Sequence, residues 1–218
     1  AYDYSFFLHI YLGGHFFPTR DALLQARAVG TSLPIQTAVG VSGGMGVLAH
    51  LVQAHLDVHS DHVDVKVDAK NAFNALHRRA ILAGVDEHFP RLSPYTRAMY
   101  DPAFPGSLWH RLDSGVWMEL RSEEGTQQGD PLGPFYFCLG IHPLLERVAA
   151  AHPDCIVIAY MDDVHILGPP ESAHAAFGML SQELGTVGLV VTPGKCQAYS
   201  PAAMDQVQSF FPQEMWRP

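Results

Sequence analysis

The chain has 218 residues, of which 48% are hydrophobic and 16% are charged, and its formal net charge is −9 at pH 7. This length suits one sizeable globular domain, and the apolar fraction excludes an intrinsically disordered chain. The acidic balance argues against a freestanding nucleic-acid-binding module, which normally presents a basic face.

No apolar run reaches the roughly 18 residues of a membrane-spanning helix, so no membrane contact is expected. The three cysteines are far apart and form no Cys-x-x-Cys pair, which favours a reducing, intracellular setting over a disulfide framework. His55, His59 and His62 have the spacing of one helical face. Because no cysteine or acidic residue completes a zinc set, we interpret them as a solvated helix end.

Taken in chain order, the apolar pattern first predicts helices over residues 20–29 and 47–56. Apolar and polar residues then alternate from Val63 to Val67, which is typical of a strand with one buried face. Residues 71–82 return to a helical pattern. The first part of the chain therefore predicts a strand flanked by helices.

Residues 85–125 are rich in proline, glycine and charge. Within them we expect a short strand pair at 108–112 and 117–120. The turn between these strands would use Asp113-Ser114-Gly115, because these residue types favour tight turns.

Pro131 suits the first turn of a long helix that runs to about Ala151. Pro143 inside this helix is expected to end it, kink it or mark its restart. The remaining elements are predicted as two strands, a helix and a last strand pair, at residues 155–160, 164–167, 171–184, 189–191 and 196–199. This order predicts an antiparallel sheet with helices packed on one face.

Three carboxylates fall at the ends of predicted strands. Asp68 follows one strand, and Asp162 and Asp163 occupy the tip of a hairpin. Adjacent carboxylates repel one another, and burying them without a partner is costly. If the strands are neighbours, Asp68 and Asp162 converge on two divalent ions ~4 Å apart, as two-metal phosphoryl transfer requires. Oxygen-only ligands favour Mg²⁺ or Mn²⁺, whereas Asp-Asp taken alone is more often a plain turn.

Four sequence blocks occur in order: VKVDAKNAFN at 65–74, GTQQGDPLGP at 125–134, YMDD at 160–163, and Gly188-Leu189 followed by Lys195-Cys196. Together they resemble the palm of reverse transcriptases. Residues 36–44 and the amino-acid sequences of the first two blocks resemble those of non-LTR retrotransposon enzymes. The Tyr-x-Asp-Asp box alone is a weak signal, but four blocks in order are specific.

The resemblance assigns the metal chemistry. Asp68 and Asp162 would bind both metal ions, with Asp163 secondary, and the backbone carbonyl of Ala69 would complete one shell. Two Mg²⁺ or Mn²⁺ ions are the implied cofactors. Lys195 would neutralise or protonate the departing pyrophosphate.

The resemblance also assigns the substrate contacts. Asn71 and Ala72 would present backbone N–H groups to the phosphates of the incoming nucleotide. Gln128 and Gly129 would lie beside that nucleotide and the template base, and Tyr160 of the YMDD box would also contact substrate. The ring of Phe73 would be a steric gate that blocks a ribose 2′-hydroxyl.

Several of these assignments have a plainer alternative. Phe73 could pack in the core, and Lys195 could be a solvated lysine at a strand end. The Gln128-Gly129 loop could simply cap the following helix, with Asp130 as the N-cap. Arg78 and Arg79 could touch a backbone phosphate or form a solvated helix face.

We therefore predict an α+β polymerase palm, with a small antiparallel sheet backed by helices, partial fingers and no complete thumb. Residues 1–35 would be a fingers remnant. Residues 36–200 would be the reverse transcriptase palm, with a fingers–palm insertion at about 85–125, and residues 201–218 a C-terminal tail. No basic fingers block precedes Gln36, so a longer parent chain would supply the missing fingers and thumb.

The expected function is RNA-directed DNA polymerisation, a nucleotidyl transfer that adds dNTPs to a DNA primer on an RNA template. One alternative is a non-catalytic palm relic that acts as a structural or binding domain, which the net charge of −9 favours. Another is a different two-metal enzyme such as a nucleotide cyclase, against which the template-facing Gln128-Gly129 block argues. The family resemblance implies action in the nucleus.

Overall fold

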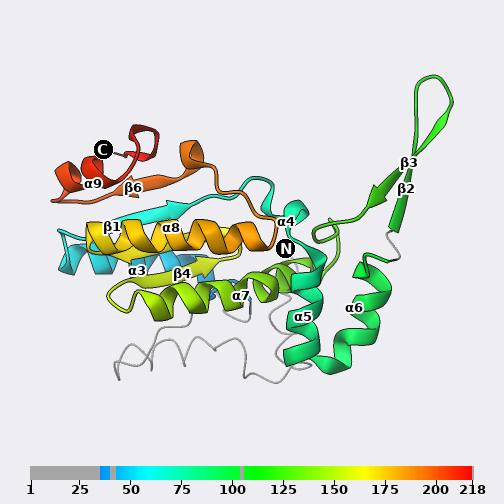
Figure 1. The fold of residues 1–218 in the computed structure, drawn as a ribbon, viewed down its shortest axis with the longest axis horizontal. Helices are drawn as coiled ribbons and strands as arrows, with labels where there is room; N and C mark the ends of the chain where they lie inside the picture. Colours follow the sequence, from blue (N-terminus) through cyan, green and yellow to red (C-terminus); the bar gives the residue numbers. More distant parts are fainter. Residues whose placement is uncertain (1–34, 40–42, 104–105, 218) are drawn as a thin grey trace.

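The computed structural model describes residues 35–39, 43–103 and 106–217. The predicted helix over 20–29 and almost all of the predicted fingers remnant lie outside these residues. The helices are α3 Gly44–Val58, α4 Ala72–Ala75, α5 Arg78–His88, α6 Ser93–Tyr100, α7 Gly133–Ala151, α8 Pro170–Thr186 and α9 Met204–Phe210. The strands are β1 Val63–Val67, β2 Gly106–Arg111, β3 Trp117–Ser122, β4 Ile156–Tyr160, β5 Asp163–Gly168 and β6 Gln197–Tyr199, and the 3₁₀ turns are η1 Pro90–Leu92, η2 Pro193–Lys195 and η3 Gln213–Met215. This mixture of helices and antiparallel strands is the predicted α+β class (Figure 1).

The main sheet has the strand order β4-β5-β1-β6, and each neighbouring pair is antiparallel. Val63, Val65 and Val67 of β1 are almost completely buried, while the residues between them are only half-buried. The predicted alternation of β1 is therefore confirmed. Because Val67 pairs with Val164 of β5, the C-terminal end of β1 meets the β4–β5 turn.

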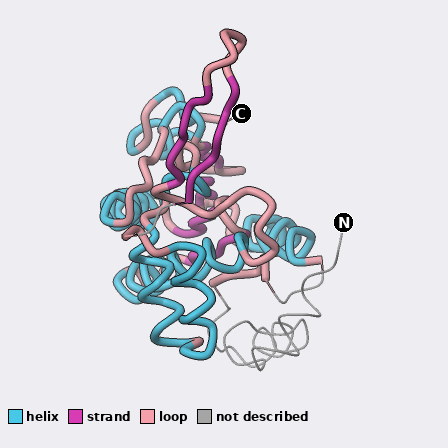
Figure 2. The backbone as a smooth tube through the Cα atoms, turned by 90° about the vertical axis from the view of Figure 1, so that its right-hand side faces the viewer, coloured by secondary structure: helices cyan, strands magenta, loops and turns pink. Residues whose placement is uncertain are grey.

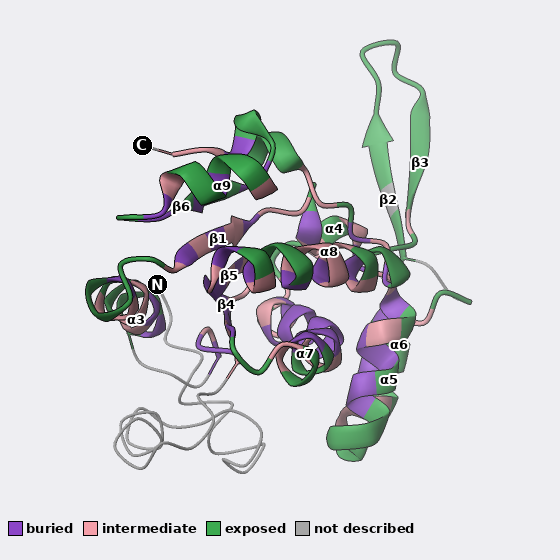
Figure 3. Cartoon of the chain, turned by 60° about the vertical axis from the view of Figure 1, so that its left-hand side comes forward, coloured by how far each residue is buried: buried purple, intermediate pink, exposed green. Residues whose placement is uncertain are grey.

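Helices α7 and α8 cover the sheet face that carries Val65, and α3 lies on the opposite side of the sheet (Figure 3). Leu48 and Leu56 of α3 are buried, as is Ile158 of β4, whose register with His165 places it on that second face. The prediction of helices on one face concerned the helices that follow β1, and α3 lies on the other face. The second face of the sheet also carries apolar residues near β4, and packing of α3 against that face removes them from water.

The predicted single helix over 71–82 is broken in two. Leu76 and His77 are extended, with ψ of 124° at both residues, between α4 and α5. Their backbone groups bond elsewhere: His77 N–H donates to the carbonyl of Val187 at 2.8 Å, and the carbonyl of Leu76 accepts from Gly125 N–H at 2.9 Å. Tertiary hydrogen bonds thus replace the helical ones at the break.

Pro143 neither ends nor restarts α7, which runs continuously from Gly133 to Ala151. A proline inside a helix removes one hydrogen bond and costs about 3 kcal/mol. Leu139, Leu144 and Leu145 around it are almost completely buried. This packing offsets the local cost. The start at Gly133, two residues after the predicted Pro131, is a small difference in boundary.

The predicted pair of strands 189–191 and 196–199 does not form. Instead β6 pairs with β1, and Val191 forms an isolated antiparallel bridge with Ala69. Lys70 N–H donates to the carbonyl of Val190 at 2.8 Å, and Thr192 N–H donates to the carbonyl of Asp68 at 3.0 Å. Both segments therefore extend along the same edge of β1, because that edge offers free backbone groups.

The predicted hairpin is present as β2 and β3, and it projects from the body of the molecule (Figures 1 and 2). Gly115 has φ of 84° in its turn, a conformation that favours glycine. Trp109 and Trp117 are 61% and 59% exposed. Among the described residues, none of the helices has the length and apolar character needed to span a bilayer.

Candidate active site

The structure brings the predicted carboxylates to one end of the main sheet. Asp68 directly follows β1, and Asp162 lies in the turn between β4 and β5. The β4–β5 turn is tight, since Met161 has φ of 56° and Tyr160 pairs with Asp163. The charge of Asp68 acts on Asp162, so the two side chains share one electrostatic environment.

One oxygen of Asp68 is buried and has no hydrogen-bond partner among the described residues. The Asp68 side chain as a whole is 39% exposed, and the ammonium of Lys195 lies 3.9 Å from the buried Oδ1. That separation is too long for a hydrogen bond. A buried, unpartnered carboxylate oxygen is costly in a protein and is a natural position for a cation ligand.

Asp162 is exposed on one side and on the other lines a cavity of about 10 Å³. The other lining residues are all apolar and come from β1, β5, α4, α7, α8 and the segments that follow β1 and α8. This volume is room for about one water molecule. Partial loss of water raises the pKa of Asp162, and the negative charges of Asp163 and Asp68 raise it further, while its own backbone N–H and Lys66 lower it.

The raised pKa predicts a pH effect on stability. Because the folded state holds the Asp162 proton more tightly than the unfolded state, the metal-free fold loses stability as pH rises from the unfolded value of about 3.9 through the folded pKa. Asp162→Asn lacks this ionisation. In urea titrations with EDTA, the stability of Asp162→Asn relative to wild type should therefore increase with pH over that window and then level off. A stability difference independent of pH would contradict the assignment.

Asp163 is held by a different partner. Its carboxylate forms an ion pair with the ammonium of Lys66 at 2.8 Å, and both side chains are about one-third exposed (36% and 34%). Within the described part of the chain, no three His, Cys, Asp or Glu side chains converge as a metal-binding group. Of the three predicted carboxylates, Asp163 is therefore the one with a close ion pair among the described residues, whereas the ammonium nearest Asp68 lies 3.9 Å away.

Cys196, which the sequence reasoning did not single out as a site residue, fixes the backbone of Asp68. Its sulfur accepts a hydrogen bond from Asp68 N–H at 3.3 Å, and Thr192 N–H donates to the carbonyl of Asp68. Ala69, the next residue, is held by its bridge to Val191. The only sequence signal for Cys196 is its position directly after Lys195 in the fourth block.

The residues after Ala69 turn sharply into α4. Asn71 has φ of 51° and is exposed, and its side-chain oxygen accepts a hydrogen bond from the amide of Asn74 at 2.7 Å. Ala72 is buried. Phe73 is half-buried and stacks on Phe137 of α7, with ring centroids 4.4 Å apart and an interplanar angle of 24°. Phe73 thus contributes to the core and also keeps part of its ring accessible.

The second block lies against the first. Thr126 N–H donates to the carbonyl of Phe73 at 2.7 Å, and its hydroxyl donates to the same oxygen at 3.3 Å. Gln128 and Gly129 are exposed at the tip of this loop, and Gly129 has φ of 88°. The loop that carries these two predicted substrate contacts is therefore fixed beside Phe73.

Asp130 does not cap α7. Its carboxylate accepts from Leu132 N–H at 2.9 Å and from the Tyr100 hydroxyl, while the N-cap position belongs to Leu132. Asp130 therefore closes the turn before the helix. The capping alternative for this loop is wrong in that detail.

Gly125, at the start of this loop, predicts a large stability effect. It has φ of 71°, and an added Cβ would lie 2.4 Å from the Asn74 backbone. Gly125→Ala should lower the free energy of unfolding by roughly 2–4 kcal/mol, measured by urea denaturation. Gly129→Ala is the matched control, because Gly129 also has positive φ but no atom within 4 Å of the added Cβ. It should cost only about 1 kcal/mol, and equal costs would contradict the close approach.

A family model described as reverse transcriptase (RNA-dependent DNA polymerase) matches residues 36–211. The chain belongs to the reverse transcriptase family. It is 26% identical over 164 residues to the retrotransposable element SLACS 132 kDa protein of Trypanosoma brucei gambiense. That match covers 72% of this chain and 14% of the SLACS protein, so this reverse transcriptase domain spans a small part of that relative's length. The predicted resemblance to retrotransposon reverse transcriptases is confirmed.

Solved telomerase structures share the fold of this reverse transcriptase domain. Telomerase from Candida albicans, in complex with a TWJ fragment of telomeric RNA, has a TM-score of 0.59 at 12% identity, covering 78% of this chain and 32% of its own. Telomerase from Candida tropicalis, in a similar complex, has a TM-score of 0.58 at 13% identity, covering 91% of this chain and 35% of its own. The predicted palm-like α+β fold is confirmed by these similarities.

Tyr160 and Lys195 complete the set of predicted site residues of the reverse transcriptase domain. Tyr160 is half-buried beside the first turn of α3, where a Cβ added at Gly44 would lie 3.4 Å from its ring and 1.9 Å from the carbonyl oxygen of Thr37. A glycine is therefore required at position 44 for α3 to approach this closely. Lys195 is 62% exposed in η2, and Asp68 is its ion-pair partner.

Two arginines after the first block behave differently. Arg79 is exposed, and its guanidinium bonds to the ring of His77 and to the carbonyl of Thr186. Arg78 is only 1% exposed, so both of its predicted roles, a phosphate contact and a solvated helix face, are wrong. The oxygens that accept hydrogen bonds from the Arg78 guanidinium belong to residues more than 40 positions later.

The three histidines of α3 and the following turn gather into one cluster. Nε2 of His55 lies 3.0 Å from Nδ1 of His62, and the ring of His59 stacks on that of His62. Partial burial lowers the pKa values of His55 and His62, and the neighbouring imidazoles lower them further. His59 is exposed but the other two are half-buried, so only part of this helix end is solvated.

Proposed function

We propose that this chain forms the catalytic core of an RNA-directed DNA polymerase, which adds dNTPs to the 3′ end of a DNA primer. The observation that carries the proposal is the convergence of Asp68 and Asp162 at the end of β1 and the β4–β5 turn. One Asp68 oxygen is buried there without a hydrogen bond. Two acidic groups at the ends of neighbouring strands, in a chain of this family, fit phosphoryl transfer assisted by divalent cations.

The donor set fits hard divalent cations. Asp68 and Asp162, together with the backbone carbonyl of Ala69, would hold two Mg²⁺ or Mn²⁺ ions. Asp163 would take a secondary part, because Lys66 already neutralises its carboxylate. When bound, such ions supply activation of the primer 3′-hydroxyl and charge stabilisation of the leaving pyrophosphate.

The other predicted residues would contact the incoming nucleotide and the template. The backbone N–H groups of Asn71 and Ala72 would contact the triphosphate, and Phe73 would face the sugar. The exposed Gln128 and Gly129 would contact the nucleotide and the template base.

Two further residues would act at the edge of the site. Tyr160 lies at the end of β4, directly before the acidic turn, and would contact substrate. Lys195, with its exposed ammonium near Asp68, would meet the pyrophosphate.

The partners of this activity would be an RNA template, a DNA primer and dNTPs. Reverse transcriptase family membership supports binding of template and primer. Because the chain spans 14% of the SLACS protein, the fingers and thumb that grip the duplex would come from a longer parent chain. Residues 1–35, 36–200 and 201–218 would then be the fingers remnant, palm and tail, and the parent protein would act in the nucleus.

Primer extension tests the proposal directly. The purified chain is incubated with a labelled DNA primer on an RNA template and dNTPs, first with Mg²⁺ and then with Mn²⁺. Extension whose sequence follows the template is expected. Nucleotide addition that ignores template sequence would contradict the proposal and favour another two-metal enzyme.

The second candidate is a non-catalytic reverse transcriptase-like palm that acts as a structural or binding domain. The net charge of −9 favours it because negative charge repels a nucleic acid. The Lys66–Asp163 ion pair also favours it, because Lys66 reduces the attraction of the Asp163 carboxylate for a second cation. Absence of extension, even after the flanking segments of a parent chain are added, would support this candidate.

A further inference from the structure

Arg78, the first residue of α5, is buried, and no carboxylate of the described residues pairs with its guanidinium. The guanidinium donates instead to oxygens of one short segment. Nε bonds the carbonyl of Gly125 at 3.1 Å, and Nη1 bonds the carbonyl of Ser122 at 2.6 Å. Nη2 bonds the Ser122 hydroxyl at 2.7 Å and the carbonyl of Glu124 at 3.4 Å. Almost the whole planar fork of five N–H donors is therefore used on residues 122–125.

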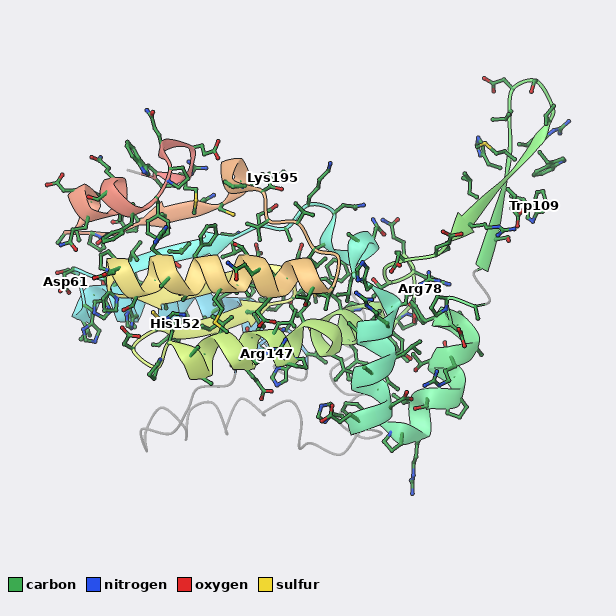
Figure 4. The ribbon with its side chains drawn as sticks, viewed as in Figure 1. Asp61, Arg78, Trp109, Arg147, His152 and Lys195 are labelled. Atoms are coloured by element: carbon green, nitrogen blue, oxygen red, sulfur yellow. The ribbon has the colours of Figure 1, made fainter. Side chains whose placement is uncertain are left out.

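The segment that Arg78 holds joins two parts of the molecule. Ser122 is the last residue of β3, at the base of the projecting hairpin, and Gly125 begins the loop of the second sequence block. Figure 4 shows Arg78 at the top of α5, near the base of the hairpin. The backbone N–H of Arg78 also donates to the Glu124 carboxylate at 3.2 Å, which ties the start of α5 to the same segment.

Tyr100, at the end of α6, extends this contact to the rest of the loop. The Arg78 guanidinium carbon lies 5.3 Å from the centre of the Tyr100 ring, within the range of a cation–π interaction. The Tyr100 hydroxyl accepts a hydrogen bond from Gln127 N–H at 3.1 Å and donates to the carboxylate of Asp130. Burial raises the pKa of Tyr100, so the hydroxyl keeps the proton that it donates.

The opposite side of the loop contacts the first sequence block. Gly125 N–H donates to the carbonyl of Leu76 at 2.9 Å, and Thr126 N–H donates to that of Phe73 at 2.7 Å. Arg78 and Tyr100 thus hold the loop from one side while the backbone around Phe73 holds it from the other. Gln128 and Gly129 remain exposed between Gln127 and Asp130, which are both fixed.

We propose that Arg78 is a positioning residue for nucleotide binding, which fixes the 125–130 loop beside Phe73 by anchoring its backbone at Ser122 and Gly125. The proposal rests on the proposed polymerase function for its link to substrate. Arg78 contacts no reacting group itself and acts through Gln128 and Gly129. Tyr100 is the second support of the same loop.

Arginine is specifically required by this geometry. Its planar guanidinium presents five donors in a fixed fork, whereas a lysine ammonium presents three donors at one point. Lysine at position 78 would keep the charge but could donate hydrogen bonds to only some of the oxygens of Ser122, Glu124 and Gly125. Arg78→Lys therefore keeps a basic side chain at this position and removes the guanidinium fork.

The test compares Arg78→Lys with Arg79→Lys in the full chain. Arg79 is the adjacent, exposed residue, so the same substitution there controls for any general effect of lysine at the start of α5. Hydrogen exchange should be at least tenfold faster at the amides of Gly125, Thr126 and Gln127 in Arg78→Lys, with amides of β1 and β5 unchanged. Arg79→Lys should leave all of these rates as in wild type. Uniformly faster exchange, or no change, in Arg78→Lys would overturn the proposal.

Tyr100→Phe provides a second variant that keeps the ring beneath the guanidinium and removes only the hydroxyl. It should accelerate exchange at Gln127 and leave that at Gly125, which Arg78 fixes, unchanged. Equal acceleration at both amides would overturn the division of roles between Arg78 and Tyr100.

Steady-state incorporation supplies the functional readout. Arg78→Lys should raise the KM for the templated dNTP about tenfold or more and lower kcat by a smaller factor, because loop placement affects nucleotide binding first. A fall in kcat at unchanged KM would overturn the positioning role. If no primer is extended even after the flanking segments of a parent chain are added, the proposed function fails, and hydrogen exchange still decides whether Arg78 fixes the loop.

Discussion

Asp162→Ala is expected to abolish template-directed nucleotide incorporation while leaving the fold intact. Asp162 supplies one of the two carboxylates that converge at the end of β1 and the β4–β5 turn. Without it the remaining ligands, Asp68 and the Ala69 carbonyl, cannot hold two cations, so the rate should fall at least ~10³-fold, or about 4 kcal/mol in activation free energy. Extension of a labelled DNA primer on an RNA template measures the effect.

The fold should survive this change because Asp162 is exposed in a turn and forms no ion pair with another described residue. Circular dichroism and urea denaturation should show a variant at least as stable as wild type at pH 7, since the change removes a carboxylate whose charged form is disfavoured. Asp205→Ala, on the exposed side of α9, is the matched control and should extend primers normally. Retained incorporation by folded Asp162→Ala would remove Asp162 from the catalytic set.

The convergence of Asp68 and Asp162 is predictable from the sequence for a simple reason. The alternation over 63–67 defines a half-buried strand, and the short apolar runs on either side of Asp162 and Asp163 define a hairpin. Once the two are neighbours in an antiparallel sheet, the ends that carry the acids must meet. Local sequence patterns are therefore enough to predict this convergence, because the geometry of an antiparallel sheet determines which strand ends meet.

Long-range hydrogen bonds account for what the sequence does not predict. The 71–82 pattern is helical on both sides of Leu76, and the break there depends on partners at Val187 and Gly125. Likewise, two adjacent arginines are typical of a solvent-exposed helix face. Nothing in the neighbouring sequence indicates that carbonyl groups of residues 122–125 accept hydrogen bonds from Arg78. The Lys66–Asp163 ion pair needs the register of β1 and β5, which places Lys66 opposite His165 and near the turn.

The burial of α3 against the second sheet face has a similar origin. Its apolar positions predict an amphipathic helix but not which face of the sheet it covers. The choice depends on Gly44, which lets the first turn approach the carbonyl of Thr37 and the ring of Tyr160. A single glycine in a glycine-rich segment carries no such information in the sequence alone.

Phe73→Val should relax the selection of deoxyribonucleotides over ribonucleotides by at least tenfold. In the proposed function the ring of Phe73 faces the sugar of the incoming nucleotide, and valine removes most of that bulk. A steric block of this kind is typically worth ~1–3 kcal/mol, or about 10- to 200-fold in discrimination. The ratio of kcat/KM for a dNTP and the matching rNTP, measured on one RNA template, gives the effect.

Packing and gating must be separated, because the Phe73 ring also stacks on Phe137 at 4.4 Å. Loss of a half-buried aromatic contact should cost roughly 1–2 kcal/mol of stability in Phe73→Val. Phe137→Leu removes the same stacking from the other side and should cost a similar amount, yet it keeps the Phe73 ring. If only Phe73→Val admits ribonucleotides, the ring itself selects the sugar. If both variants admit ribonucleotides equally, the stacking of Phe73 on Phe137 controls selection. Phe73 is then not a steric gate, because Phe137→Leu keeps the Phe73 ring and a gate formed by that ring would still exclude ribonucleotides.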